Sequence, residues 1–419
     1  MNMKKTLFSL FAVMFFGTIA VAQVRPYDKD GLNVFETKKE DLVKFEKMKL
    51  KLGGSFTQSF QTLEHSTTST ATPVAIVPGF NTAIANLYLD AYLADGVTLN
   101  MALYLSARHH QETWVKGGYI QFDKLPFLKS ALLDKVMEYT TIKVGHMEIN
   151  YGDAHFRRSD NGNSIYNPFV ENYIMDAFTT EIGAEVDFQY KGFLAVAGLT
   201  TGKIKGDIAK ATVYAGGSDG KAYPAILGKI GYDSQISDLV RLRLTASGYY
   251  TKGSVSNTLY GGDRGGSHYY GVLDAGLATT NFTSGRFNPG FTDKIGAFMA
   301  NAFLKVGGLE WFTTYEAAKG RAKNETIERN ANQFATDLLY RFGKNENFWI
   351  GGRYNTVSAT MATGDIDINR IAISGGWFVT KNILTKLEYV NQKYNGFPAG
   401  DLRNGGKFNG FVLEAIVGF

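Results

Sequence analysis

A group of charged side chains lies in the stretch 150–178, which lacks the alternation of a strand. The group contains Asp153, Arg157, Arg158 and Asp160. Arginine keeps its positive charge at any physiological pH. At a narrow aqueous passage, fixed charge of one sign selects ions of the opposite sign. We therefore expect these four residues to form a charged constriction, with a solvated surface loop as the alternative.

A second set of charged residues alternates with apolar ones. In VRLRLTASGYY, Arg241 and Arg243 alternate with Val240 and Leu242. Successive side chains of a strand point to opposite faces, so the charged positions share one face. The same alternation turns these further residues inward, as the lining of a pore: Arg108, Lys143, Lys229, Arg341, Arg353, Lys386, Asp90, Glu181, Glu185, Asp187, Glu310, Asp337 and Glu388. The two signs nearly balance. A mild anion preference and a mixed wall of cross-strand ion pairs both remain open.

Few groups suit catalysis or metal binding. His109, His110 and Glu112 could hold a metal, but a polar rim explains them better. The stretch GGSDGKA near Gly216 lacks the spacing and the Ser or Thr of a phosphate-binding loop. A net charge of +5 is too small to indicate nucleic acid. We expect no enzyme activity, no cofactor and no metal.

The N-terminus has the pattern of an export signal. Lys4 and Lys5 precede a short apolar run, and Ala20 and Ala22 form a small-x-small cleavage site. The run is shorter than a membrane-spanning helix needs. We expect residues 1–22 to be removed, residues 23–47 to form a charged periplasmic segment that could partly enter the barrel, and residues 48–419 to form the fold.

Alternating segments of about ten residues fill the rest of the chain. We count sixteen, which start near residues 48, 82, 97, 113, 139, 179, 192, 224, 239, 294, 309, 332, 347, 366, 382 and 408. Short and long links alternate: the links after the odd-numbered strands, the thirteenth included, are long, apart from a short one at His109. The link KLPFLKSALLDKVMEY on the short side suits a brief amphipathic helix. This pattern predicts an all-β transmembrane antiparallel barrel with long extracellular loops and short periplasmic turns.

The last strand has one uniformly apolar face that ends on an aromatic residue. Its members are Phe411, Leu413, Ala415, Val417 and Phe419. An open sheet edge is intolerable in lipid, so we expect this strand to close against the first. The apolar face would then meet lipid, and its spacing resembles the C-terminal assembly signal of outer-membrane barrels.

The mature chain resembles the phosphate-selective porin O/P family, in particular its versions from the Bacteroidota. The resemblance rests on the overall plan, on IKVGHMEINYGDAHFRRSDNG with the following YNPF, and on the closing GFVLEAIVGF. It implies a sixteen-stranded, trimeric channel for anions such as phosphate in the outer membrane of a Gram-negative bacterium. Phosphate-selective members line their pore with a ladder of arginines, which cannot be placed on this sequence.

Two functions follow from these patterns. The first is a porin for passive diffusion of small hydrophilic solutes, with a mild anion preference. The second is a plugged or accessory barrel that acts through the long loop 257–291 as a binding or adhesion subunit of a larger complex. The expected partners are outer-membrane lipid and lipopolysaccharide, the barrel assembly machinery and, by resemblance, two further copies of the chain.

Overall fold

The computed structural model describes residues 36, 39, 45–106, 113–204, 210, 212–276 and 283–419. The expected signal peptide lies outside these residues. So do Arg108, His109, His110 and Glu112.

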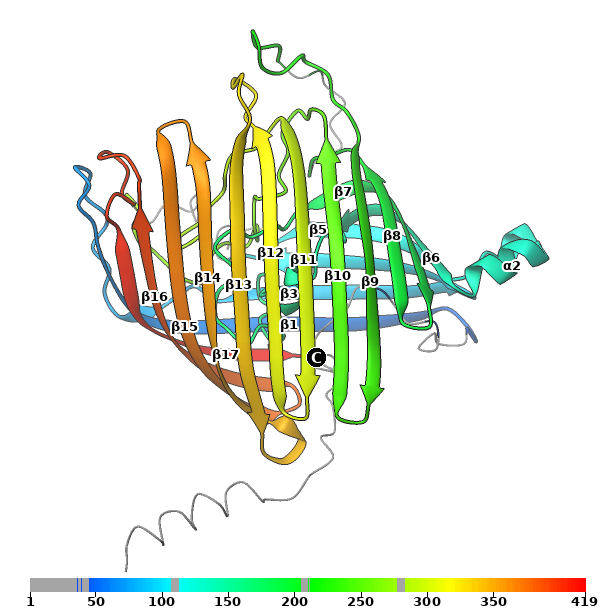
Figure 1. Cartoon of the computed structure of the whole chain (residues 1–419). Coiled ribbons are helices and arrows are strands. Elements are labelled where there is room, and N and C mark those ends of the chain that lie inside the picture. The colour runs from blue at the N-terminus through cyan, green and yellow to red at the C-terminus, as the bar shows by residue number, and fades with distance from the viewer. Residues whose placement is uncertain are drawn as a thin grey trace, which may run out of the picture.

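Antiparallel strands make up most of the molecule (Figure 1). Within the described residues there are sixteen strands of eight residues or more, and one strand, β2, of two residues. Their bounds are β1 Lys49–Ser66, β2 Gly79–Phe80, β3 Ile84–Ala94, β4 Val97–Leu105, β5 Thr113–Phe122, β6 Thr140–Glu148, β7 Thr180–Tyr190, β8 Phe193–Thr200, β9 Ala225–Ser237, β10 Val240–Thr251, β11 Lys294–Val306, β12 Leu309–Arg321, β13 Arg329–Phe342, β14 Phe348–Met361, β15 Gly364–Thr380, β16 Ile383–Asn395 and β17 Lys407–Gly418. The sixteen predicted strand starts lie within three residues of those observed.

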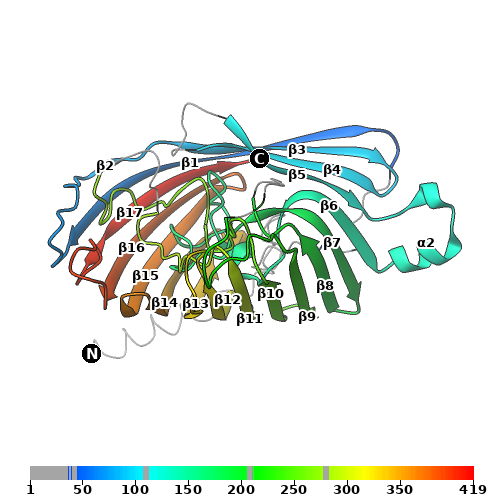
Figure 2. The ribbon, with the colours of Figure 1, turned by 90° about the horizontal axis from the view of Figure 1, so that it is seen from above.

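The sheet closes on itself to form a barrel (Figure 2). Each long strand pairs with its neighbours in the sequence, and β1 pairs with β17 from Ser55 opposite Gly418 to Ser66 opposite Lys407. The closure reaches the last residue, because the backbones of Gly54 and Phe419 exchange two hydrogen bonds of 2.9 Å. The predicted barrel and its closing strand pair are confirmed.

The outer face of the barrel is apolar. In β17, Phe411, Leu413 and Val417 are 50%, 48% and 38% exposed, and the terminal Phe419 is 62% exposed. At the ends of β13–β15, four rings form a stacked row: Tyr340, Phe342, Phe348 and Trp377. An apolar band bordered by aromatic rings is the surface that a membrane barrel presents to lipid.

The links at one end of the barrel are mostly short and those at the other end mostly long, as predicted, but the link after β14 differs from the prediction. On the turn side five links have two residues, such as Asp95-Gly96, and the β5–β6 link contains the predicted short helix as α2, Ala131–Met137. On the other side, called the loop side below, the long link expected after β14 has only two residues, Ala362 and Thr363. The sequence MATGDID reads as a loop, but β14 and β15 continue their pairing as far as Met361 and Gly364. Across the described residues, no helix is long and apolar enough to span a membrane.

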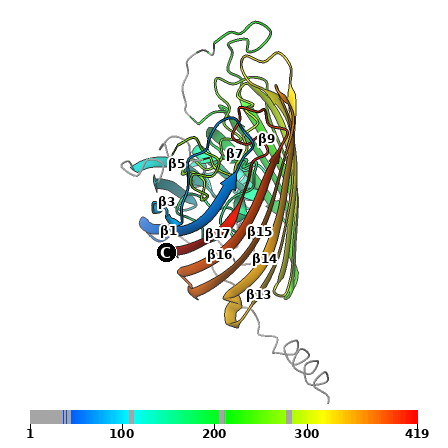
Figure 3. The ribbon, with the colours of Figure 1, turned by 90° about the vertical axis from the view of Figure 1, so that its left-hand side faces the viewer.

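Two loop-side links fold into the barrel (Figures 2 and 3). The first is residues 149–179, called the inner segment below, in which most side chains are buried. The second is the described part of 252–293, where Leu259, Tyr269 and Phe287 are at most 2% exposed. Together they form an apolar core inside the barrel. The described part of the loop 257–291, which was expected as an outer contact surface, therefore buries many of its apolar side chains instead.

Candidate functional site

A cluster of ion pairs attaches the inner segment to β9 and β10. Asp153 precedes the short helix η4, Ala154–Arg157, and its carboxylate accepts hydrogen bonds from Arg243 Nε at 2.8 Å and Thr245 Oγ1 at 2.7 Å. Lys229 Nζ lies 3.0 Å from the same carboxylate. Burial favours the neutral acid, but Arg243 and Lys229 outweigh it and hold the pKa of Asp153 well below its usual value.

The N-terminal segment contributes a residue to this cluster. Glu36 is 3% exposed, and its carboxylate lies 3.1 Å from Arg243 Nη2 and accepts a hydrogen bond of 3.0 Å from Asn150. Burial opposes its charge, but Arg243 and Lys229 lower the pKa of Glu36 to about 2. We call the set the Asp153 cluster: Glu36, Asp153, Lys229, Asp233, Arg241 and Arg243. Its three carboxylates face three cations.

Arg157 faces the wall formed by β11–β13. Its Nη1 lies 3.1 Å from the carboxylate of Glu310, which is also 2.5 Å from Arg341 Nε. The guanidinium of Arg157 lies over the rings of Phe303 and Phe312, with centroids 5.7 and 5.8 Å away. The buried side chain of Arg157 therefore links the inner segment to the wall.

Strands β14–β16 hold the backbone of the inner segment. Arg353 Nη1 donates to the carbonyl of Glu171 at 2.9 Å, and Lys386 Nζ donates to the carbonyl of Phe169 at 2.9 Å. Arg370 Nη1 donates to the carbonyl of Asn172 at 2.6 Å. These cations satisfy carbonyl groups that have no strand partner, which is a requirement for irregular backbone inside a barrel.

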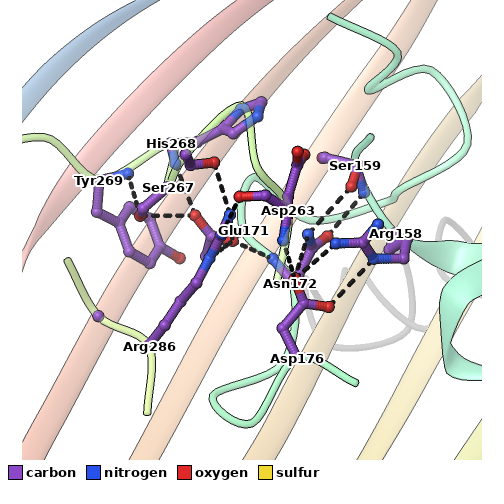
Figure 4. A network of polar contacts seen from close by, with 12 residues as sticks. Arg158, Ser159, Glu171, Asn172, Asp176, Asp263, Ser267, His268, Tyr269 and Arg286 are labelled. Carbon is purple, nitrogen blue, oxygen red and sulfur yellow. Dashed lines mark hydrogen bonds and ion pairs between the residues drawn. The ribbon is translucent and has the colours of Figure 1, made fainter. Parts of the chain in front are cut away.

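The two inward-folded links bind each other through a polar network (Figure 4). Arg286 Nη2 lies 2.9 Å from the carboxylate of Glu171, and Ser267 donates a hydrogen bond of 2.7 Å to the same carboxylate. Arg158 Nη2 lies 2.5 Å from Asp176, whose carboxylate also accepts the backbone N–H of Asp263. Each link therefore holds the other in place.

A cavity of about 260 Å³ remains between the inner segment and the wall of β3–β6. Arg158 and Asp160 line it from the inner segment, and Lys116 and Glu148 line it from the wall. Lys116 Nζ lies 2.6 Å from Asp160 and 2.8 Å from Glu148. Tyr104 donates a short hydrogen bond to Asp160. Arg158 is 5% exposed, and its Nη1 has no hydrogen-bond partner among the described residues.

A second cavity of about 510 Å³ opens at the turn ends of β7–β10. Glu36, Lys39 and Arg243 are among its lining residues. Phe156 lines the first cavity, and its ring centroid lies 5.4 Å from the guanidinium of Arg243. The Asp153 cluster and Phe156 therefore lie between the two cavities.

The structure divides the four residues expected at a constriction. All four lie inside the barrel, but Arg158 and Asp160 line the first cavity, while Asp153 attaches the inner segment to β9 and β10 and Arg157 attaches it to β12. The described members of the expected pore lining are also inside: Asp90 lines the first cavity, and the others form ion pairs or hydrogen bonds. Among these others are Lys143 with Glu185 and Asp187, Arg241 with Asp233, and Lys229, Arg243, Arg341, Arg353 and Lys386 as given above.

Sequence reasoning missed several residues of this interior. Arg370 alternates with the outward Ile371 and Ile373, so the same rule that placed Arg353 could have found it. Glu171 and Arg286 lie in irregular segments without a period, and no local signal pairs them. Among the described residues, no three His, Asp or Glu side chains gather as metal ligands.

Solved outer-membrane barrels have a similar fold. An anion-selective porin from Comamonas acidovorans aligns with a TM-score of 0.54 and 10% identity, over 89% of this chain and 100% of that one. Outer-membrane expressed OmpT of Vibrio cholerae aligns with a TM-score of 0.51 and 11% identity, over 90% and 100%. In-vitro folded OmpT of the same organism, in a trimer form, gives 0.51 and 12%, over 89% and 100%. No protein-family model and no curated protein sequence matches this chain. At these identities the likeness establishes the fold, which is that of an outer-membrane β-barrel.

Proposed function

We propose that the chain is a porin of a Gram-negative outer membrane that admits small hydrophilic solutes past the inner segment. The supporting observation is the pair of cavities inside the barrel, one beside Arg158 and one beside Glu36, with Phe156 and the Asp153 cluster between them. Fixed charge and hydrogen-bond donors in a narrow lumen are the means by which barrels select solutes. The 260 Å³ of the first cavity suits small solutes.

A mild anion preference is part of this proposal. Arg158 and Lys116 line the first cavity, and Arg158 retains a buried N–H group without a hydrogen-bond partner among the described residues. An anionic oxygen in the cavity would supply such a partner. Glu148 and Asp160 line the same cavity, so the preference is expected to be weak. The alignment with an anion-selective porin is in keeping with this choice.

Single-channel recording in a planar bilayer tests the proposal. Reconstituted protein should give stable conductance steps, and the reversal potential under a salt gradient should favour chloride. Arg158→Gln should shift that potential toward cations. Arg157→Gln is the matched control, since Arg157 pairs with Glu310 of β12 and does not line the first cavity, and it should shift the potential less. Equal shifts for both variants would contradict the assignment of Arg158 to the solute path.

A second candidate is a closed barrel that acts as a binding or accessory subunit. The observation that favours it is the packing of the lumen, where Asp153, Arg157 and Arg158 are at most 5% exposed. Silence in the bilayer from protein with heat-modifiable migration on a detergent gel would support this candidate over the porin.

The proposed partners follow from the same reading. We propose a homotrimer in contact with lipopolysaccharide. We further propose that the barrel assembly machinery inserts it by recognising the outward residues of β17 and the residue after it: Phe411, Leu413, Ala415, Val417 and Phe419. Chemical crosslinking of outer membranes tests the trimer, and a ladder that stops at the monomer would contradict it.

A further inference from the structure

The link between β5 and β6 carries exposed apolar side chains outside any spanning strand. It contains the short helix η3, Pro126–Leu128, followed by α2, and it projects from the ring of strands on the turn side (Figures 1 and 2). Its exposed apolar residues are Phe127, Leu128, Leu132 and Val136, with exposed fractions of 60%, 51%, 72% and 46%. Contiguous apolar surface of this kind on a folded protein usually marks an interaction site.

Helix α2 has two apolar faces and a polar edge. Ser130 caps its first turn, because its hydroxyl accepts the backbone N–H of Leu133. Leu132 and Val136 are four residues apart and share the exposed face. Met137 is 4% exposed on the side that packs toward the barrel. Asp134 lies about 200° around the helix from Leu132, on the polar edge. The face of Leu132 therefore lacks a partner among the described residues, although the helix is anchored on its other side.

The link is continuous with the aromatic border of the lipid-facing surface. The ring of Phe127 lies 6.2 Å from that of Phe122 at the end of β5. The ring of Tyr139, after α2, lies 6.3 Å from Phe188 and 5.3 Å from Tyr190. Phe188 and Tyr190 are each 44% exposed on the outer face of β7. Such aromatic rings mark the level of the lipid headgroups, so α2 leaves the barrel at that level.

We propose that η3 and α2 lie in the headgroup layer of the periplasmic leaflet and bury Leu132 and Val136 in phospholipid. The exposed Lys129 and Lys135 suit this position, because their aliphatic stems can lie along lipid while their ammonium groups reach the phosphates. Phospholipid fits this face because the face continues a border that lipid already covers. The link thus acts as a lateral anchor on the turn side of the barrel.

Site-directed spin labelling tests this anchor, since the chain contains no cysteine. Leu132→Cys and the matched control Asp134→Cys place one label on each side of α2. The labelled barrels are reconstituted in phosphatidylcholine vesicles, and heat-modifiable migration shows that both are folded. The label at position 132 should be several-fold less accessible to a water-soluble nickel chelate than the label at 134, and more accessible to oxygen. Equal accessibility of the two labels would overturn the proposal.

A comparison with native membranes separates lipid from a protein partner. A label at position 132 that is shielded in pure vesicles supports the lipid anchor. A label that is shielded in isolated outer membranes but open to the nickel chelate in pure vesicles would overturn it in favour of a periplasmic protein. A Val136→Cys label should behave as the label at 132 does, because the two residues share a face.

Discussion

The Asp153 cluster should decide whether the inner segment stays against β9 and β10. The substitution Asp153→Asn keeps the size of the side chain but removes one of three carboxylates that face three cations. Removing one partner of a buried ion pair costs about 3–5 kcal/mol, because the remaining charge stays buried and uncompensated. Asparagine keeps some hydrogen bonds, so we expect a cost of about 3 kcal/mol.

The substitution should destabilise the attachment of the inner segment and leave the stability of the sheet unchanged. Asp153 lies outside the strands, which are held by their own hydrogen-bonded ladders. A change of about 3 kcal/mol raises the population of the detached segment about a hundredfold, at about 1.4 kcal/mol per factor of ten. Because the cluster and Phe156 lie between the two cavities, detachment would join them. Asp153→Asn should therefore increase the open probability or the unit conductance in a planar bilayer.

The pH dependence of the same contact follows from the lowered pKa of Asp153. A carboxyl with a lowered pKa stabilises the attached state fully above its value in water, about 3.9. That stabilisation is lost as the pH falls through the lowered pKa. Wild-type conductance should thus be constant from pH 8 to about pH 5 and should rise toward the variant's value only in stronger acid.

Asp219→Asn is the control, because Asp219 lies on the exposed loop-side link after β8 and has no contact with the cluster. Its conductance should equal that of the wild type. The reasoning is refuted if Asp153→Asn protein is folded, by heat-modifiable migration, and conducts as the wild type does. It is also refuted if the variant unfolds the whole barrel, since the contact would then support the sheet.

Two further predictions concern the second inward link and the closure of the barrel. Burial opposes the charge of His268, but Glu414, 2.6 Å away, outweighs it and raises the pKa of His268. The stabilisation is then complete below about pH 6.5 and is lost as the pH rises through the raised pKa. In the wild type, the hydrogen-exchange protection of residues 259–273, corrected for intrinsic rates, should fall as the pH rises through the raised pKa of His268. In His268→Gln the same protection should be independent of pH. In β17, Gly410 has φ of +145° and a Cβ there would lie 2.1 Å from the carbonyl oxygen of Thr62, so Gly410→Ala should destabilise the barrel by about 1–3 kcal/mol in urea unfolding. At Gly54→Ala the Cβ would clash with the movable terminal ring of Phe419, 2.7 Å away, and would lie at an ordinary 3.4 Å from the carbonyl oxygen of Asn86. This substitution should cost less, and equal costs would contradict this account.

The strands could be predicted from the sequence because their signal is local. Alternation with a period of two is enforced by lipid on one face and a polar lumen on the other. The predicted length of the link after β14 was wrong. Gly364 and Asp365 are residue types typical of turns, whereas the pairing of Met361 with Gly364 depends on the neighbouring strand. The residue types near the end of a strand do not predict how far the neighbouring strand continues to pair with it.

The interior site could be predicted only in part. The sequence indicates that the inner segment carries charge, but the adjacent Arg157 and Arg158 bind different partners, one on β12 and one within the inner segment itself. Outside a strand or a long helix no period assigns a direction to a side chain. The partners Glu310 and Asp176 are fixed by the packing of the whole barrel, and alternation along one strand does not reveal them.

The closure between β1 and β17 has a consequence for biosynthesis. The first strand leaves the ribosome early, but the residues that cover its edge, up to Phe419, are made only after all the intervening strands. Until then Lys49–Ser66 carries an unpaired edge and an apolar face, a combination that favours aggregation. Pairing ends so distant in the chain is also intrinsically slow. The unfolded chain therefore exposes this edge and face until β17 is present, and a truncation that removes the residues paired with β1 would leave the cylinder unsealed.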